Sequence, residues 1–481
     1  MEKTWRNFMI CLAGGILFHH LFYGKELGVS YPIYAMFLYL VFYARVAIKG
    51  KKQEWFHFVL GGSALLLAVS FGIFSNEPLL VLNFLIVPLL MFIHMVHTRR
   101  WDLEKWSNRL FIKLMFITFF ETIIDFFNVI FSAGKTGKGV MHDQKGQMVK
   151  KIILGVLLSA PLLWTILYLL ISSDQYFKQL LGKFPDWLYQ ANIGSMFFQV
   201  ILVAVITCLL FAFFMTLAKP LVLNSGEGES RSMKLDTVIV STMLILLNIV
   251  YFLYAAVQFT YFFTGDPSSS ASAYTYAEYA RRGFMELTLV SIINIGLLFL
   301  LTHIGKFEKR VLPNIIKLLL SLLVFFTFVM LASAYNRLSL YEQAYGYTYL
   351  RLYAHAFMVL LCILLGLALI KIYIQRFKLL KAMCIATIVA YVIVNYINID
   401  RFIVSQNMKR YEETGKLDLY YLDRLSYDAI PIMIEQKNEM FNKLLKEKKM
   451  QLIQEETTWQ TFNVSKSHAK QLLKEWTSNN E

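Results

Sequence analysis

The sequence predicts an all-α protein: a polytopic bundle of about eleven membrane-spanning helices with a small helical extension at the C-terminus. Two observations indicate this fold class. Of the 481 residues, 57% are hydrophobic and only 16% are charged, against about 25% charged in soluble proteins. The apolar residues also fall in runs of about 18 residues or more, the length that an α-helix needs to cross a bilayer.

Each predicted span is an apolar run with few charges. The first run follows a basic start but lacks a small-residue cleavage site, so we interpret it as a retained helix rather than a signal peptide. The expected spans are about residues 8–24, 31–48, 56–74, 79–96, 152–172, 196–217, 237–263, 284–304, 316–336, 352–370 and 380–398.

The spans divide the chain into four expected regions. Residues 1–100 form a four-span region, 101–151 a cytoplasmic loop, 152–398 a seven-span core and 399–481 an extracytoplasmic helical tail. The loop contains LFIKLMFITFFETIIDFFNVIF, residues 110–131, whose polar and apolar residues fall on opposite helical faces. That pattern favours a helix lying in the membrane interface. The alternative is a twelfth span, which would reverse the orientation of everything after it.

The distribution of basic residues predicts the orientation and excludes a nucleic-acid partner. Although the formal charge is +15, the Lys and Arg residues lie mainly in short loops between apolar runs. With the N-terminus cytoplasmic, the inner segments hold 27 of them and the outer loops hold 7. This asymmetry is the positive-inside signal of a cell-membrane protein, and it places the C-terminus outside. The four cysteines lie inside apolar runs and predict no disulfide in a loop.

The outer loops carry unusual polarity. YNRLSLYEQAYGYTYLR, residues 335–351, lies between two of the most apolar stretches. Arg337, Tyr341 and Tyr345 are four residues apart and share one helical face. Gly346 is typical of the left-handed position that ends a helix, and Thr348 of the cap that begins the next. We therefore expect a tight outer hairpin.

Two further polar stretches lie on the same predicted side. YAEYARRGFMEL, which ends at Leu287, has Glu and Arg residues spaced by four that can pair along a helix. NIDRFIVSQN, residues 398–407, is followed by LDLYYLDRLSYDAIP, residues 417–431. Ionisable groups at membrane depth indicate a functional site, although Tyr and Arg at a boundary can also be ordinary anchors. The candidate ligand-binding residues are Glu278, Arg281, Arg282, Glu286, Arg337, Tyr341, Glu342, Tyr345, Arg351, Asp400, Arg401, Asp418 and Asp428.

These three stretches, with LYAAVQFTYFF at residues 253–263, resemble signature stretches of bacterial multi-pass membrane proteins in the domain-of-unknown-function families 4153 and 4173. The resemblance covers roughly residues 150–435, and the motifs occur in the same order. It implies a bacterial cell-membrane protein. It supplies no reaction and no catalytic residue.

The best functional hypothesis is an outward-facing Arg/Glu/Tyr site that recognises or handles a cell-envelope component. Arginines favour an anionic group, such as that of a lipid or glycan. One alternative is a transporter for a small molecule or ion. Another is a glycosyltransferase-like envelope enzyme, whose candidate bases are Glu278, Glu286, Glu342 and Asp400. Within the membrane, Asn248, Gln258 and Asn294 favour hydrogen bonds between helices. We expect no cofactor and no metal. The lipid bilayer is an expected partner, and the sequence leaves protein partners open.

The tail is expected to cover the hairpin. LDLYYLDRLSYDAIPIMIEQ has apolar residues at helical spacing, with Ser426 as a plausible cap for a second helix. Such a face needs an apolar partner, so we expect residues 417–435 to fold over residues 335–351. Asp418, Asp423 or Asp428 would then reach Arg281, Arg337 or Arg351. His355, one turn from Arg351, could join this network.

Overall fold

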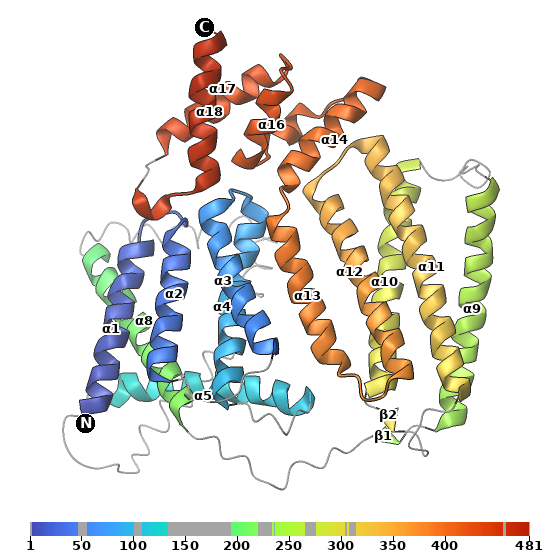
Figure 1. The fold of residues 1–481 in the computed structure, drawn as a ribbon, viewed down its shortest axis with the longest axis horizontal. Coiled ribbons are helices and arrows are strands. Elements are labelled where there is room, and N and C mark those ends of the chain that lie inside the picture. The colour runs from blue at the N-terminus through green and yellow to red at the C-terminus, as the bar shows by residue number, and fades with distance from the viewer. Residues whose placement is uncertain are drawn as a thin grey trace, which may run out of the picture. The chain divides into compact units, whose positions relative to one another are not determined.

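The structure is a computed structural model of the whole chain, drawn in Figure 1. It describes residues 2–46, 55–100, 108–132, 194–219, 233–234, 236–264, 276–303, 305–306, 314–455 and 458–480. The predicted span at 152–172 lies outside these residues. The described part is built from α-helices, with one parallel pair of two-residue strands, β1 (Met233–Lys234) and β2 (Gly305–Lys306). The predicted all-α fold is therefore confirmed.

The chain packs as two compact units. The first contains Met1–Lys52 and Met95–Leu221, and the second contains Gln53–His94 and Val222–Glu481. This division differs from the four regions expected from the sequence. The difference arises because α3 (Trp55–Ile73) packs against α13 (Leu379–Tyr396), more than 300 residues later.

The long helices of the second unit are apolar enough to cross a bilayer. They are α3, α4 (Glu77–Arg100), α9 (Thr237–Thr264), α10 (Tyr276–His303), α11 (Asn314–Tyr345), α12 (Tyr349–Tyr373) and α13. With α8 (Gly194–Ala218) of the first unit they make eight candidate spans among the described residues. All eight coincide with predicted spans. The protein is thus a multi-pass membrane protein.

The first unit holds α1 (Glu2–Phe22), α2 (Ser30–Arg45), α5 (Asn108–Ser132) and α8 (Gly194–Ala218), together with the end of α4. α1 and α2 lie where spans were predicted at 8–24 and 31–48, but they are not among the eight candidate spans, so these two spans stay predictions. Within this unit, Figure 1 shows α5 lying across the direction of α1 and α8. Asp125 on its polar face accepts hydrogen bonds from Thr216 at 2.6 Å and from Lys219 at 2.7 Å. A crosswise amphipathic helix is what the interfacial prediction requires, and its place in the membrane stays a prediction.

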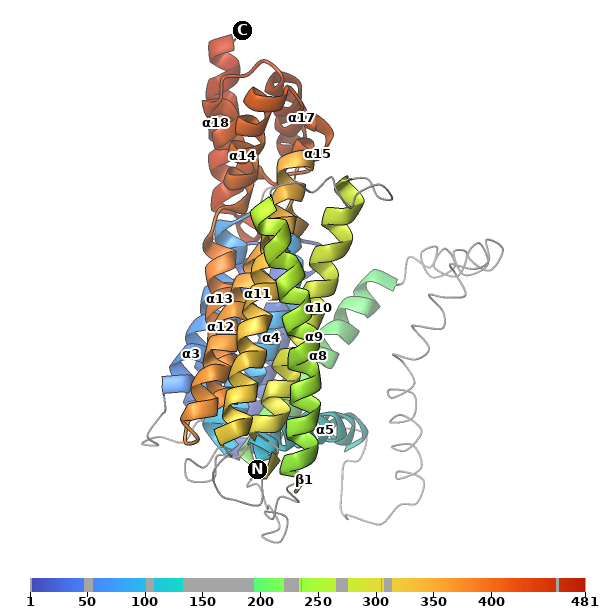
Figure 2. The same cartoon turned by 90° about the vertical axis from the view of Figure 1, so that its right-hand side faces the viewer.

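α11 is the central helix of the second unit, packed against α9, α10 and α12 (Figure 2). Leu320, Leu323 and Leu331 on α11 are buried in the shared core. Because lipid is as apolar as leucine, packing and interhelical hydrogen bonds hold such helices together. Asn294 donates to Thr327 at 2.9 Å and accepts from Tyr251 at 2.9 Å. The predicted role of the in-span amides is confirmed, and each such bond contributes about 0.6 kcal/mol.

The C-terminal tail forms a second core at one end of the α11–α13 bundle (Figure 2). Its elements are α14 (Ile399–Thr414), α15 (Leu419–Asp423), η3 (Tyr427–Ala429), α16 (Ile430–Glu435), α17 (Phe441–Gln454), η4 (Trp459–Thr461) and α18 (Val464–Asn480). Ile403, Ile430 and Phe441 are fully buried there. Each such side chain contributes about 1.5–3 kcal/mol on leaving water. Ser426 caps η3 as predicted, by accepting from the Asp428 N–H.

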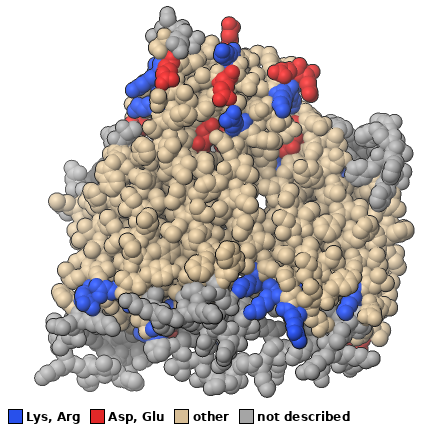
Figure 3. All heavy atoms as spheres, viewed as in Figure 1, with Lys and Arg blue, Asp and Glu red and all other residues tan. Residues whose placement is uncertain are grey.

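The surface over the long helices is almost free of charge, whereas the tail carries both signs (Figure 3). At the opposite end of the second unit from the tail, the turn between α12 and α13 carries Arg376 and Lys378, and the first turn of α13 carries Lys381. A neutral belt between two charged ends is what a bilayer requires, because charges are costly in hydrocarbon.

Candidate functional site

The α11–α12 hairpin is closed by Gly346. Its φ of +85° lies in the left-handed region, where glycine carries no Cβ penalty, and its N–H donates to the Glu342 carbonyl at 2.7 Å. A Cβ at this position would lie 2.6 Å from Asn407 Oδ1. Thr348 occupies the predicted cap of α12, although its side chain makes no capping bond. The predicted hairpin is confirmed.

Arg337 of α11 lies half-buried against α9 and α10. It donates to Gln258 Oε1 at 3.2 Å, and Ser333 Oγ donates to the same oxygen at 2.7 Å. On α10, a Cβ at Gly283 would lie 1.9 Å from Arg337 Nη1. Gly283 therefore provides the space that the guanidinium occupies. Three helices together position one cation at this end of the bundle.

Glu342 and His355 form a buried pair across the hairpin. His355 Nε2 lies 2.9 Å from Glu342 Oε2, and the side chains are 12% and 4% exposed, respectively. The ring of Tyr335 packs edge-on to His355, with centroids 4.3 Å apart. Among the described residues, neither Glu342 Oε1 nor His355 Nδ1 has a hydrogen-bond partner. Buried polar atoms without partners are rare, and each costs about 1–3 kcal/mol.

Arg351 opens α12 beside this pair. Its guanidinium lies 4.3 Å from the centre of the Tyr341 ring and donates to the Gly346 carbonyl. Tyr345 packs next to Tyr341, with ring centroids 5.0 Å apart. The cation–π contact and the carbonyl hold the guanidinium plane beside the hairpin turn.

Asp400 lies in a buried polar cluster between the tail and the membrane helices. It is 1% exposed and accepts from Tyr349 Oη, Ser426 N at 2.9 Å and Asn76 Nδ2 at 2.8 Å. Asp428 accepts from the Ser75 N–H at 2.9 Å. A cavity of about 10 Å³ beside both carboxylates has room for about one water molecule. Together these bonds connect the turn between α3 and α4, and the start of α12, to the tail.

Burial raises the pKa of Asp428 above its ordinary value, and the charge of Asp400 adds to the rise. Hydrogen bonds from Ser465, Ser75 and Ser426 act in the opposite direction without cancelling it. Ser426 Oγ lies 3.0 Å from Asp400 Oδ1 and 3.1 Å from Asp428 Oδ2. One hydroxyl has a single proton, so it can donate to only one of the two carboxylates at a time.

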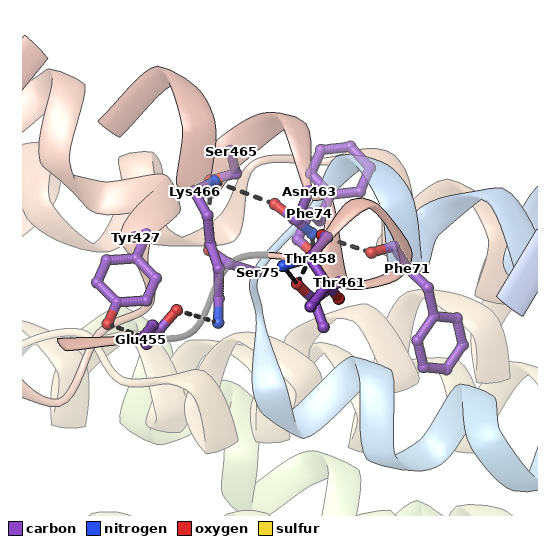
Figure 4. A network of polar contacts seen from close by, with 10 residues as sticks. All are labelled: Phe71, Phe74, Ser75, Tyr427, Glu455, Thr458, Thr461, Asn463, Ser465 and Lys466. Atoms are coloured by element: carbon purple, nitrogen blue, oxygen red, sulfur yellow. Dashed lines mark hydrogen bonds and ion pairs between the residues drawn. The ribbon is translucent and has the colours of Figure 1, made fainter. Parts of the chain in front are cut away.

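A second polar network joins the end of the tail to the end of α3 (Figure 4). Asn463 Nδ2 donates to the Phe71 carbonyl at 2.9 Å and to the Phe74 carbonyl at 2.7 Å. Phe71 lies in the last turn of α3 and Phe74 directly follows the helix, so no further turn satisfies these carbonyls. Beside them Lys466 pairs with Glu455 at 2.8 Å, and Tyr427 donates to the same carboxylate at 3.0 Å.

The tail covers the hairpin, but over a different part than expected. The contacts with residues 343–347 come from Asn407 and Arg410 of α14 rather than from residues 417–435, which contact Tyr349 and Leu352 of α12. Asn407 exchanges two 2.9 Å bonds with the Tyr347 backbone, and Arg410 donates to the Gln343 and Ala344 carbonyls. Leu422 and Leu425 share a core with Leu352.

The acidic residues of the tail have other partners than the arginines we expected. Asp418 caps α15 by accepting from the Tyr421 N–H at 3.0 Å, and Asp428 bonds Ser75. The Arg401–Glu435 pair, at 3.5 Å, is exposed and contributes little. Glu286 is exposed on α10. The side chains of Glu278, Arg281 and Arg282 lie outside the described residues.

Sequence reasoning missed several members of these clusters. Gly283 has no signal of its own, because only the approach of Arg337 shows why a side chain is excluded there. Ser75 and Asn76 read as ordinary turn residues between two spans. Asn407 ends the polar stretch at 398–407 but is not among the predicted candidates, and Arg410 lies beyond that stretch. Each acts through a partner far away in the chain.

Comparison with known families covers both the hairpin residues and the buried cluster around Asp400 and Asp428. A family model described as a domain of unknown function (DUF4153) matches residues 61–436. The chain belongs to this family. The DUF4153 match begins at residue 61, well before the start at about 150 that the resemblance indicated. It therefore includes most of α3 and all of α4, whose turn bonds Asp400 and Asp428. No curated protein and no solved structure matches the chain.

Proposed function

We propose that the protein recognises an anionic component of the bacterial cell envelope at the hairpin end of α9–α12. The observation that carries this proposal is the buried Glu342–His355 pair, in which one oxygen and one ring nitrogen have no hydrogen-bond partner within the described part of the chain. A ligand hydroxyl could donate to Glu342 Oε1, and a second polar group could bond His355 Nδ1. Binding would then recover part of the cost of burying both atoms.

Two half-buried arginines on the same hairpin indicate the charge of the ligand. Arg337 precedes Glu342 by five residues on α11, and Arg351 precedes His355 by four on α12. A guanidinium offers a planar fork of donors that matches phosphate or carboxylate in two-point contacts. The ligand class that fits both features is an anionic group that also bears hydroxyls, as in a phosphorylated lipid headgroup or a glycan.

The direction in which this site faces is part of the proposal. The basic turn between α12 and α13 lies at the end of the bundle away from the tail. The positive-inside rule would place that turn in the cytoplasm and the hairpin outside. In the cell membrane, the N-terminus would then be cytoplasmic, and the tail would cover an extracytoplasmic site.

A second candidate function, envelope modification, rests on the same pair. If His355 donates its Nε2 proton to Glu342, Nδ1 keeps a lone pair and can act as a base. No comparable observation favours transport. Asn248 and Asn294 are engaged in bonds between helices rather than facing a path.

The test is comparative lipid and glycan analysis of a strain that lacks the gene, followed by complementation with variants. We expect Arg337→Lys, Arg351→Lys and Glu342→Gln to fail to restore the wild-type envelope while the protein still accumulates. In the two arginine variants, lysine keeps the charge but loses the planar fork. Arg376→Lys, in the turn at the other end of α12, is the matched control and should restore the wild-type envelope. A lipid or glycan species that is modified only in the wild-type strain would favour the second candidate function, envelope modification. If loss of function follows loss of protein for every variant, the cluster is structural and the proposal fails.

A further inference from the structure

The first unit contains a cavity of about 230 Å³ among α1, α2 and α8. Its walls are apolar, with Val41, Phe211, Phe214 and Met215 among the residues that line them. The polar lining residues are Asn7, Arg45 and Lys219, which we take as the rim of the cavity. Arg45 ends α2, and Lys219 directly follows the end of α8, so the rim lies at the polar ends of these two helices.

The surroundings of this cavity are positively charged. Arg99 donates to the carbonyl of Ala218, a lining residue, at 3.2 Å. The Arg99 Nε is buried and has no partner among the described residues. The ammonium of Lys219 is paired with Asp125 at 2.6 Å. Three cations, Arg45, Arg99 and Lys219, therefore lie near the rim, and Lys219 among them is paired with Asp125.

We propose that this cavity binds a phospholipid with an anionic headgroup. The apolar walls would take the first part of an acyl chain, and the phosphate would lie at the rim against Arg45. Basic pockets between membrane helices bind anionic headgroups in this way. The cavity is smaller than the 300 Å³ or more that an enclosed small-molecule site needs. It suits part of a lipid whose remaining chain stays in the bilayer. The proposal concerns a different unit from the hairpin site and does not rest on the proposed function.

The test uses the full-length protein in a neutral detergent. Titration with phosphatidylglycerol, phosphatidylcholine or inorganic phosphate, followed by thermal unfolding and native mass spectrometry, gives the affinity for each. We expect phosphatidylglycerol alone to bind and stabilise. Arg45→Gln should raise its Kd about fivefold, as loss of one interfacial charge implies. Lys25→Gln is the matched control, because Lys25 follows α1 at the other end and bonds the His20 carbonyl at 2.8 Å.

A second variant probes the apolar walls. Val41→Phe places a larger side chain in the cavity and should reduce phosphatidylglycerol binding without changing the charge. Equal stabilisation by phosphatidylcholine would overturn the proposal, and so would equal effects of Arg45→Gln and Lys25→Gln. Binding of inorganic phosphate with the same affinity as the lipid would mean an anion site without a lipid, which also overturns it. Arg45→Gln should restore the envelope as well as the wild type does. The lipid proposal and the hairpin-site proposal can therefore be refuted independently.

Discussion

Asp428 of the tail accepts a hydrogen bond at 2.9 Å from the backbone N–H of Ser75, which lies between α3 and α4 and 353 residues earlier in the chain. The contact joins the tail directly to a pair of membrane helices. Asp428 is only 7% exposed. Removal of the carboxyl group would therefore leave the Ser75 N–H buried without this hydrogen bond, and removal of the N–H would do the same to the carboxyl group. Docking of the tail is therefore coupled to the state of this carboxyl group.

The first prediction is that the docked tail is more stable at acidic pH. Burial and Asp400 raise the pKa of Asp428 in the folded state. The stabilisation is then complete below the pKa of an unfolded aspartate, about 3.9, and is lost as the pH rises through the higher folded value. Hydrogen exchange of residues 417–435 at pH 4.5 and 7.5 should show slower exchange at 4.5, after correction for the intrinsic rate.

Asp428→Asn is the control for this titration. An amide oxygen in the place of Oδ2 can still accept from the Ser75 N–H and from the Ser426 hydroxyl, so the fold should persist. Its corrected exchange rates should be nearly equal at both pH values. A wild type in which the tail exchanges more slowly at pH 7.5 would contradict the prediction.

The second prediction concerns the space for Arg337. Gly283→Ala would place a Cβ 1.9 Å from Arg337 Nη1, so the guanidinium must move and its bond to Gln258 must break. We expect loss of envelope complementation of the size seen for Arg337→Lys. Gly296→Ala, on the same helix with nothing within 4 Å of the new Cβ, should retain full function. Equal envelope complementation by Gly283→Ala and Gly296→Ala would show that function does not depend on the position of the Arg337 guanidinium.

The third prediction separates backbone strain from steric contact at two glycines. Gly415 has φ +66° and open space, so Gly415→Ala should cost about 1 kcal/mol of stability. Gly346 has φ +85° and a Cβ there would lie 2.6 Å from Asn407 Oδ1, so Gly346→Ala should cost more. Thermal unfolding of the purified variants measures both. A Gly346→Ala variant as stable as Gly415→Ala would mean that the Asn407 contact shifts without cost.

The fourth prediction concerns orientation. In a background without the four native cysteines, a cysteine at Tyr420, which is 74% exposed in the tail, should react with an impermeant thiol reagent on whole cells. A cysteine at Gln375, exposed in the turn between α12 and α13, should react only after the cells are opened. The reverse labelling pattern would mean that the membrane orientation is inverted.

Much of the fold follows from local sequence. The apolar runs predict the spans because the bilayer selects for length and hydrophobicity, which are properties of each segment alone. Gly346 predicts the end of α11, and Ser426 predicts the cap of η3, because caps and turns depend on a few neighbouring residues. These predictions needed no knowledge of any distant contact.

The tertiary structure alone decided which residues meet. Arg337 is placed by a missing side chain on α10, Asp428 bonds a turn between α3 and α4, and Glu342 meets His355 across a hairpin. The pattern of apolar residues could not determine these pairings. In lipid, a helix gains nearly the same hydrophobic free energy against any neighbour. Small residues that allow close approach and single polar contacts therefore select the partner, and both depend on residues far apart in the chain.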